Sequence, residues 1–364
     1  MNITYVYPEP LPDRKARAIS VLNTVRALSR STPTTLIYEK SPAKAQIESK
    51  ENLTVAPLGK SLMGIRSNKI FNYHLRRYLS RQNPDFLYLR HLKTAAYLLK
   101  HYRGPAKILF ECHEIFSETN PDIRALEEFV YEHSDGLIFI NQTLQREIET
   151  AFDISQIPAR VIDNGCSFNL PFLSKDFSDL RSLVYIGNFY PWKGVDLLID
   201  AMQYLPDMRL EIIGDGERRE VLEAKIREQG LDRRVTLHGY RPHNEVVEIL
   251  RDALLTVIPN TVSAYTRFST PIKLYEYMAA STIVLSSDMP TVREIVEDGV
   301  NGFLFTTGDP RDLARTVEKI RALAPETLSR IAYAAYQTSK NYTWEARGRK
   351  ITEFLKSLSN EPTT

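Results

Sequence analysis

Residues 182–202 read Ser182-Leu-Val-Tyr-Ile-Gly-Asn-Phe-Tyr-Pro-Trp-Lys-Gly-Val-Asp-Leu-Leu-Ile-Asp-Ala-Met202. The first five residues are apolar or favour β structure, so they predict a buried strand over Ser182–Ile186. Gly187 permits a tight turn, and apolar side chains then return at the spacing of a helix that packs on a sheet. These apolar residues are Val195, Leu198, Ile199 and Met202. A strand, a turn and a packed helix begin a βαβ unit, so the segment predicts a parallel α/β sheet.

The same alternation continues through both halves of the chain and predicts two doubly wound, Rossmann-like α/β domains. The strands predicted in the first half are Ile3–Tyr7, Thr34–Tyr38, Phe86–Arg90, Lys107–Glu111 and Gly136–Ile140. Those predicted after Ser182–Ile186 are Leu210–Ile213, Val235–Leu237, Leu255–Ile258, Ile283–Ser286 and Gly302–Phe305. Residues 164–181 are polar and turn-forming, as expected of a connection. We therefore expect domains at 1–168 and 182–341, and a helix within 342–364 that packs back on the first domain.

Composition excludes several classes of protein. The chain has 364 residues, of which 43% are hydrophobic and 25% charged, so it is neither disordered nor collagen-like. Its apolar runs are much shorter than the roughly 20 residues of a membrane span. Cys112 and Cys166 lie far apart with no ligand spacing, so neither a disulfide framework nor a zinc site is indicated. The N-terminus reads as a strand rather than a signal peptide, so a cytoplasmic location is expected.

Charge is balanced over the chain but not along it. The formal net charge is +2, yet the segment Lys60–Lys107 holds eleven basic residues and one acidic residue, Asp85. Such a segment can bind phosphate groups or contact an anionic membrane at the inner membrane surface. The alternative is an ordinary solvated helix face. A nucleic-acid partner is not expected.

In parallel α/β sheets, ligands bind beyond the carboxyl ends of the strands, where helix N-termini favour anions. Lys193 lies just before the helix that follows Ser182–Ile186, so it can place a cation beside a phosphate, or it can be a lysine in solvent. Gly214 begins a Gly-x-Gly turn after another predicted strand, which allows close approach of a ligand but is also typical of a structural turn. Tyr240 and Arg241 follow the next strand, where a ring and backbone amides could hold a nucleobase.

The segment after Tyr265 carries the most chemistry. Ser269 or Thr270 can cap a helix and Pro271 suits its first position, which leaves the N–H groups of Ile272 and Lys273 free for a diphosphate. Glu276, on the same helix, can accept hydrogen bonds from vicinal ribose hydroxyls, or it can be an exposed surface glutamate. The neighbouring Tyr275, Tyr277 and Met278 are predicted to be core residues.

Together these motifs resemble the nucleotide-sugar-binding half of retaining glycosyltransferases of family 4. The segments that carry the resemblance are Gly187 to Gly194, Ile213-Gly-Asp-Gly216, His238-Gly239, Pro271-Ile-Lys-Leu-Tyr-Glu-Tyr-Met-Ala279 and Arg293-Glu-Ile-Val-Glu-Asp-Gly-Val-Asn-Gly-Phe-Leu-Phe305. The first half fits more loosely, through Glu111-Cys-His-Glu114 and Asp163-Asn-Gly165.

The resemblance implies the GT-B architecture, in which two Rossmann-like domains face a cleft and bind the donor in the second half and the acceptor in the first. It implies a metal-independent transfer with retention, from a UDP-sugar in preference to a GDP-sugar, to a glycan or lipid-linked acceptor of cell-envelope polysaccharide synthesis. The catalytic residues implied are Lys193, which neutralises the diphosphate, His113, beside the transferred sugar, and Glu276, which binds the ribose. The donor-binding residues implied are Gly187, Asn188, Lys193, Gly214, Tyr240, Arg241, Ser269, Thr270, Ile272, Lys273 and Glu276. The acceptor-binding residues are Arg14, Lys15, Arg17, His113 and Glu114.

Two positions depart from the family pattern. The family often has Arg or Lys where this chain has Asn188, and an acid that touches the transferred sugar where this chain has Phe268. Two alternative functions therefore stay open: a partner protein that binds nucleotide-sugar without catalysis, and a nucleotide-sugar epimerase.

Overall fold

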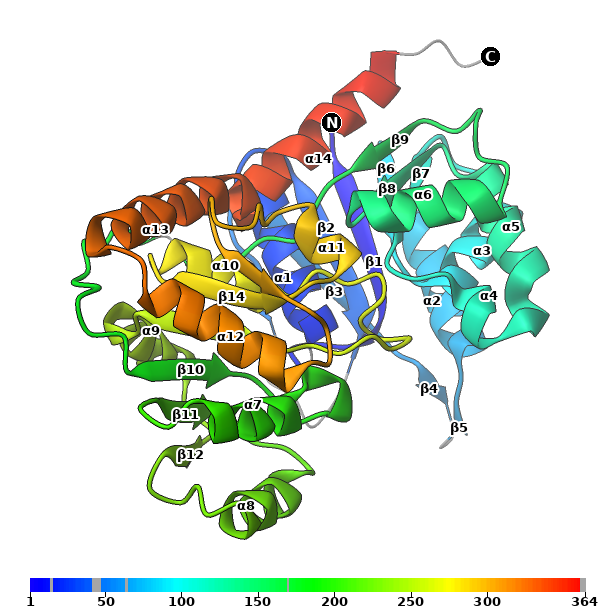
Figure 1. Cartoon of the computed structure of the whole chain (residues 1–364). Helices are drawn as coiled ribbons and strands as arrows, with labels where there is room; N and C mark the ends of the chain where they lie inside the picture. Colours follow the sequence, from blue (N-terminus) through cyan, green and yellow to red (C-terminus); the bar gives the residue numbers. More distant parts are fainter. Residues whose placement is uncertain (14–15, 41–46, 63–64, 169, 361–364) are drawn as a thin grey trace. The chain divides into compact units, whose positions relative to one another are not determined.

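The computed structural model describes residues 1–13, 16–40, 47–62, 65–168 and 170–360 (Figure 1). Contacts between residues divide the chain into two units. Unit 1 comprises residues 1–165 together with the stretch that begins at Trp344, and unit 2 comprises Cys166–Thr343. The chain therefore leaves unit 1 once and returns to it.

Unit 1 is built on a parallel sheet with the strand order β3-β2-β1-β6-β7-β8-β9. Its strands are β1 (Ile3–Pro10), β2 (Thr34–Glu39), β3 (Leu53–Leu58), β6 (Phe86–Leu89), β7 (Lys107–Cys112), β8 (Gly136–Phe139) and β9 (Ala159–Val161). A separate antiparallel pair consists of β4 (Ser61–Leu62) and β5 (Ile65–Arg66). The central strands are apolar almost without interruption because helices cover both faces of a parallel sheet. All four residues of β6 and of β8, for example, are buried.

The helices of unit 1 include the last helix of the chain. They are α1 (Ala16–Ser29), α2 (Asn68–Leu79), α3 (Leu92–His101), α4 (Phe116–Thr119), η1 (Pro121–Ile123), α5 (Arg124–His133), α6 (Gln142–Ala151) and α14 (Trp344–Asn360). Helix α14 packs closely on α1, because a Cβ atom added to Gly348 would lie 2.9 Å from the Cβ of Ala27. Ile351, Phe354 and Leu355 of α14 complete the core over β1.

Unit 2 is built on a second parallel sheet, in the order β12-β11-β10-β13-β14-β15. Its strands are β10 (Ser182–Ile186), β11 (Arg209–Ile213), β12 (Val235–Gly239), β13 (Leu255–Ile258), β14 (Ile283–Ser287) and β15 (Phe303–Phe305). Its helices are η2 (Pro191–Lys193), α7 (Val195–Ala201), η3 (Met202–Tyr204), α8 (Arg219–Glu228), α9 (His243–Asp252), α10 (Ile272–Ala279), α11 (Pro290–Arg293), α12 (Pro310–Arg321), α13 (Pro325–Ser339) and η4 (Lys340–Tyr342). Separate apolar clusters fill the two faces of this sheet.

The predicted fold class, two Rossmann-like α/β units, is confirmed, while some boundaries differ. Strand β3 was not predicted, because Pro57 interrupts its β pattern, and β9 is too short to show a period. Unit 1 ends at Gly165, three residues before the expected boundary. The segment expected to connect the domains belongs to unit 2, because Phe177 and Leu180 are buried in its core.

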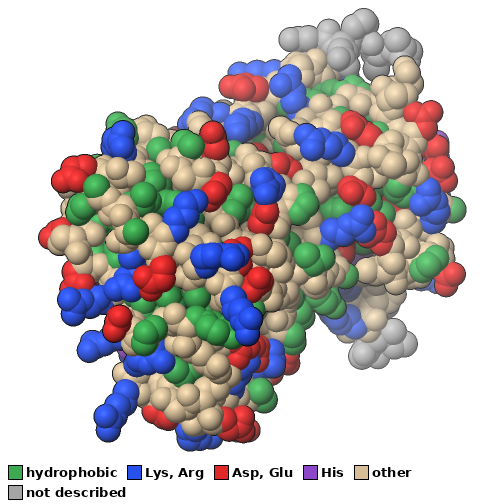
Figure 2. All heavy atoms as spheres, in the orientation of Figure 1, with side chains coloured by type: hydrophobic (Ala, Val, Ile, Leu, Met, Phe, Trp, Pro, Cys, Tyr) green, Lys and Arg blue, Asp and Glu red, His purple; other side chains and the backbone are tan. Residues whose placement is uncertain are grey.

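The face drawn in Figure 2 carries basic and acidic side chains interspersed, in keeping with the 47 basic and 45 acidic residues of the chain.

Candidate functional site

The loops that follow β10, β11 and β12 are joined by their backbones. The N–H of Gly187 donates to the carbonyl of Ile213 at 2.9 Å, and the N–H of Gly214 donates to the carbonyl of Gly239 at 2.9 Å. Gly214 has a φ of 141°, and a Cβ atom there would lie 1.8 Å from the Gly187 oxygen. The two glycines predicted to form turns therefore lie in direct contact, and their close approach requires glycine at position 214.

Lys193 is held between two loops at the carboxyl edge of the sheet. Gly194, the next residue, has a φ of 69°, and a Cβ atom there would lie 1.9 Å from the Pro259 oxygen. The N–H of Thr261 donates to the carbonyl of Trp192 at 3.0 Å, so the loop after β13 is fixed to the loop after β10. Lys193 is half-buried, and burial followed by the neighbouring charge of Lys273 lowers its pKa.

Helix α10 brings Lys273 and Glu276 to the same edge. The hydroxyl of Tyr277 accepts a hydrogen bond from the N–H of Ile186, at the end of β10, at 2.9 Å. Lys273 Nζ lies 2.6 Å from Glu276 Oε2, and Glu276 is only 7% exposed. Three side chains predicted to bind the donor, Lys193, Lys273 and Glu276, are therefore gathered in one place.

The residues beside Glu276 on α10 are core residues, as predicted. Tyr275, Tyr277 and Met278 are fully buried. Glu276 is itself buried, so it is not the exposed surface glutamate of the alternative interpretation.

The predicted cap of α10 is wrong. Pro271 is the N-cap residue rather than the first helical residue, and no side chain caps the helix. The hydroxyl of Ser269 donates to the Tyr265 carbonyl at 3.0 Å, and that of Thr270 lies 3.5 Å from the Thr291 carbonyl, so both are engaged elsewhere. The first-turn N–H groups of α10 consequently receive no side-chain acceptor from the described residues, and such groups attract anions.

An aromatic stack lies beside this cluster and was not predicted. The Trp192 ring stacks on Tyr190 at 4.8 Å between centroids and on Tyr265 at 4.5 Å. The Tyr-x-Trp spacing at the end of β10 was its only sequence signal. Phe268, at the position of the expected acid, is 4% exposed, with the Arg267 guanidinium 4.7 Å from its ring centroid.

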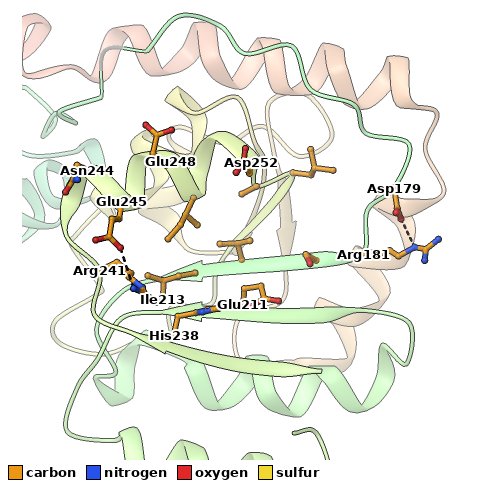
Figure 3. A pocket seen from close by; sticks show the side chains of 15 residues that line it. Asp179, Arg181, Glu211, Ile213, His238, Arg241, Asn244, Glu245, Glu248 and Asp252 are labelled. Atoms are coloured by element: carbon orange, nitrogen blue, oxygen red, sulfur yellow. Dashed lines mark hydrogen bonds and ion pairs between the residues drawn. The ribbon is translucent and has the colours of Figure 1, made fainter. Parts of the chain in front are cut away.

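The other predicted donor residues lie further along the edge of the sheet. Asn188 and Tyr240 are exposed, and Arg241 lies 3.5 Å from Glu245. Arg241 lines a pocket of about 780 Å³ between α9 and the strands β10 to β12. Figure 3 shows Glu248 and Asp252 of α9 on one side of this pocket and Glu211 and His238 on the other.

This pocket is a separate feature of unit 2. Lys193, Lys273 and Glu276 do not line it. Arg181 lies 2.6 Å from Asp179 and Arg241 lies 3.5 Å from Glu245, but the lining holds five acidic side chains against these two arginines, so acidic charge predominates in it.

In unit 1, His113 belongs to a buried charged network. Its Nε2 hydrogen-bonds to Glu111, which also accepts from the Tyr88 hydroxyl and lies 2.8 Å from Arg347 of α14. Burial and then the nearby charge of Arg90 lower the pKa of His113 to about 4. Burial alone would raise the pKa of Glu111, but Arg347 and His113 hold it well below its usual range. His113 is therefore a neutral imidazole at pH 7, oriented by a carboxylate.

The remaining acceptor-site predictions concern three residues that follow β1 in the sequence and Glu114, which follows β7. Arg14 and Lys15 lie outside the described residues. Arg17 is paired with Glu9 at 3.2 Å, and Glu114 is exposed beside His113.

The described residues contain neither a cluster of metal ligands nor a helix suited to cross a membrane. No group of three or more His, Cys, Asp or Glu side chains among them could hold a metal ion. In the same part of the chain, no helix combines the length and apolar character that crossing a bilayer needs.

Known sequences match both units. A family model described as Glycosyltransferase Family 4 matches residues 18–169, and one described as Glycosyl transferases group 1 matches residues 173–338. The chain is 26% identical over 235 residues to an uncharacterized glycosyltransferase of Methanocaldococcus jannaschii, covering 64% of this chain and 62% of that protein. It is 24% identical over 264 residues to a D-inositol 3-phosphate glycosyltransferase of Corynebacterium urealyticum, covering 66% and 60%. The chain thus spans less than two thirds of the length of these relatives.

Solved structures share the fold over nearly the whole chain. Sucrose-phosphate synthase of Thermosynechococcus elongatus superposes with a TM-score of 0.79 at 18% identity, over 98% of this chain and 99% of that one. HepE of Anabaena, solved with UDP, gives a TM-score of 0.79 at 19% identity, over 98% and 100%. The two family models match one unit each and meet close to the boundary between units 1 and 2, and each unit is Rossmann-like. The chain therefore belongs to the family 4 glycosyltransferases, whose GT-B fold it shares.

Proposed function

We propose that this protein is a hexosyltransferase-type glycosyltransferase that takes a sugar from a UDP-sugar held by unit 2. The observation that supports this most directly is the cluster of Lys193, Lys273 and Glu276 beside the uncapped N-terminus of α10. Lys273 is paired with Glu276, whereas Lys193 takes part in no ion pair among the described residues, and burial followed by the charge of Lys273 lowers its pKa. A diphosphate beside Lys193 would supply the missing counter-charge, so the cluster suits an anionic ligand.

Each part of the cluster has a distinct role in the proposed reaction. Lys193 and the first-turn N–H groups of α10 would stabilise the charge that develops on the leaving diphosphate. Glu276 is an acceptor when ionised, so its two carboxylate oxygens suit the two hydroxyls of a ribose. We propose that the transfer proceeds with retention and that these cations take the part that a divalent metal has in other transferases.

The choice of UDP rests on a structural relative. HepE has been solved with UDP and with UDP-glucose. We propose a UDP-sugar for this chain on that analogy, and a glycan or a lipid-linked sugar as the acceptor in unit 1.

The test measures donor binding and donor turnover separately. UDP should raise the melting temperature more than GDP or ADP at equal concentration, because the nucleotide that binds most tightly stabilises the folded state most. A ligand at 100 times its Kd adds about 2.7 kcal/mol to the free energy of unfolding. Lys193→Ala should lower turnover of the donor by about a hundredfold or more, because one preorganised donor to a developing oxyanion contributes roughly 3 kcal/mol. Lys225→Ala is the matched control, because Lys225 pairs with Asp200 away from the cluster. Equal turnover in both variants would refute the assignment of Lys193.

A second function is favoured by one observation. Phe268 is buried where the family places an acid that touches the transferred sugar. A protein that binds nucleotide-sugar without catalysis would bind UDP and UDP-glucose through Glu276 and Lys193, yet neither hydrolyse nor transfer the sugar with any acceptor.

We also propose that unit 1 contacts an anionic membrane through α2. This helix buries Phe71, Leu75 and Leu79 and exposes Lys69, Arg76 and Arg77. Tyr73, 54% exposed, lies among these basic residues. A basic helix face with an exposed aromatic ring is typical of a surface that binds anionic lipid.

A further inference from the structure

Arg90 occupies the middle of the carboxyl edge of the unit 1 sheet. It directly follows β6, which lies between β1 and β7. Leu89 pairs with Val6 on one side and with Phe110 on the other, so Arg90 is level with Tyr7 and Glu111. The carboxyl edge of a parallel sheet is where ligands bind.

The guanidinium of Arg90 is incompletely satisfied. Its Nη1 atom is buried, and no hydrogen-bond partner for it exists among the described residues. A buried donor without an acceptor costs free energy, so such an atom in a folded protein calls for a ligand or an ordered water.

Three acids near the carboxyl ends of β1, β2 and β7 are engaged with other groups, whereas Glu114, whose charge interacts with that of Arg90, is exposed and forms no ion pair among the described residues. Glu111 is bound by Arg347, Tyr88 and His113, and Glu9 by Arg17 and the Tyr7 hydroxyl. Glu39, at the end of β2, is bound by Arg66 and Lys60. Within the described residues, no ion pair includes Arg90.

The residue next to Arg90 adds no charge of its own. Burial and then the charge of Lys60 lower the pKa of His91 to about 4, so this histidine is neutral at pH 7. Its Nδ1 lies 3.0 Å from the Thr94 hydroxyl, at the start of α3. Lys93, the second residue of the same helix, is exposed. The edge therefore presents one partly buried guanidinium that takes part in no ion pair among the described residues.

We infer that Arg90 binds a phosphate group of the acceptor. A guanidinium offers paired donors that match a phosphate, and a partly buried position strengthens such charge-assisted hydrogen bonds. The inference rests on the proposed function only in assigning this phosphate to the acceptor. Binding of phosphate at Arg90 is a property of unit 1 and can be measured without turnover.

The experiment titrates the full chain with inorganic phosphate at constant ionic strength, in the presence of saturating UDP to fill the cluster in unit 2. The Kd comes from the rise in melting temperature, and the arginine Nε–Hε signals in a ¹H–¹⁵N spectrum report binding directly. Arg90→Gln should weaken phosphate binding by about 10- to 100-fold, and Arg90→Lys by less, because Lys keeps the charge without the paired donors. Arg103→Gln, which alters an exposed arginine of the same unit, should leave the Kd unchanged.

Two further probes identify the source of the phosphate. Glucose 1-phosphate represents a soluble sugar phosphate, and hexyl phosphate represents a lipid carrier. If one of these probes binds more tightly than inorganic phosphate, and Arg90→Gln abolishes that gain, the result supports the inference and identifies the class of acceptor.

The inference is overturned if the unaltered protein shows no phosphate binding at millimolar concentration, or if Arg90→Gln binds phosphate as well as Arg103→Gln does. Urea unfolding followed through the buried Trp344, in a Trp192→Phe background, shows whether unit 1 of Arg90→Gln is folded. If UDP fails to bind the unaltered protein while Arg90-dependent phosphate binding persists, the proposed donor fails and the phosphate site stands.

Discussion

Replacing Arg347 by Met should destabilise unit 1 more than any exposed substitution on α14. Arg347 is 2% exposed, and its Nη1 donates to the carbonyls of Ile162 at 2.6 Å and Asp163 at 2.8 Å. Its Nε donates to the Thr24 hydroxyl at 3.1 Å, and its Nη2 lies 2.8 Å from Glu111. Met fills a similar volume but leaves a buried carboxylate and two buried carbonyls without these donors.

The size of the effect follows from the buried charge. Removing one partner of a buried ion pair costs roughly 3–5 kcal/mol, and each orphaned carbonyl adds to this, so we expect a loss of about 4 kcal/mol or more. Glu111→Gln in the same chain removes the orphaned charge. The double variant should therefore be less destabilised than the sum of the two single variants, by about 1–3 kcal/mol.

The two tryptophans of the chain allow each unit to be followed alone. Trp344 is buried in unit 1 and Trp192 belongs to unit 2, so urea unfolding in a Trp192→Phe background reports on unit 1. Arg349→Met, at an exposed position two residues along α14, is the matched control. A loss below about 1 kcal/mol for Arg347→Met, or strictly additive variants, would refute this account of the network.

Three further outcomes are expected. The pKa values of His113 and His91 are lowered to about 4, so the unfolded chain binds more protons than the folded chain between about pH 6.5 and 4. The free energy of unfolding should therefore decrease as the pH is lowered through that range, by up to about 2.7 kcal/mol per pH unit. Equal free energies of unfolding at pH 7.5 and pH 5 would contradict this. Glu276→Gln should raise the Kd for UDP about tenfold, measured by calorimetry, whereas the exposed control Glu297→Gln should not; equal values would remove Glu276 from the donor site. Replacing Arg76, Arg77 and Arg81 by Glu should abolish binding to anionic liposomes at low salt and leave the UDP affinity unchanged. If the unaltered protein does not bind such liposomes, the proposal that α2 contacts a membrane is wrong.

Local patterns in the sequence predicted the parts of the fold that depend on neighbouring residues. The β10–α7 unit follows from apolar spacing and one glycine, and the burial of Tyr275, Tyr277 and Met278 follows from their place on an apolar helix. The proximity of Lys193 to Lys273 depends on where the strands of a parallel sheet end, which a general rule supplies.

Contacts between distant segments were not predictable. The Tyr277 hydroxyl that fixes α10 to Ile186 looks like any core tyrosine in the sequence. Arg347 lies in a polar stretch of a helix, so nothing local indicates that it is buried against Glu111. The prediction of the α10 cap was wrong because the hydroxyls of Ser269 and Thr270 bond to the carbonyls of Tyr265 and Thr291 instead. The fold brings these carbonyls into place, so the sequence alone does not show them.

The path of the chain through the two units has a consequence for biosynthesis. Unit 2 is one continuous stretch, and its two ends lie side by side, because the N–H of Cys166 donates to the carbonyl of Tyr342 at 2.8 Å. Unit 1 is completed only by α14, which leaves the ribosome after all of unit 2. Domains fold as units during synthesis, so unit 2 can reach its native state first, while the face of α1 that α14 will cover stays open until α14 has been made. Unit 1 thus begins before unit 2 during synthesis but is completed after it.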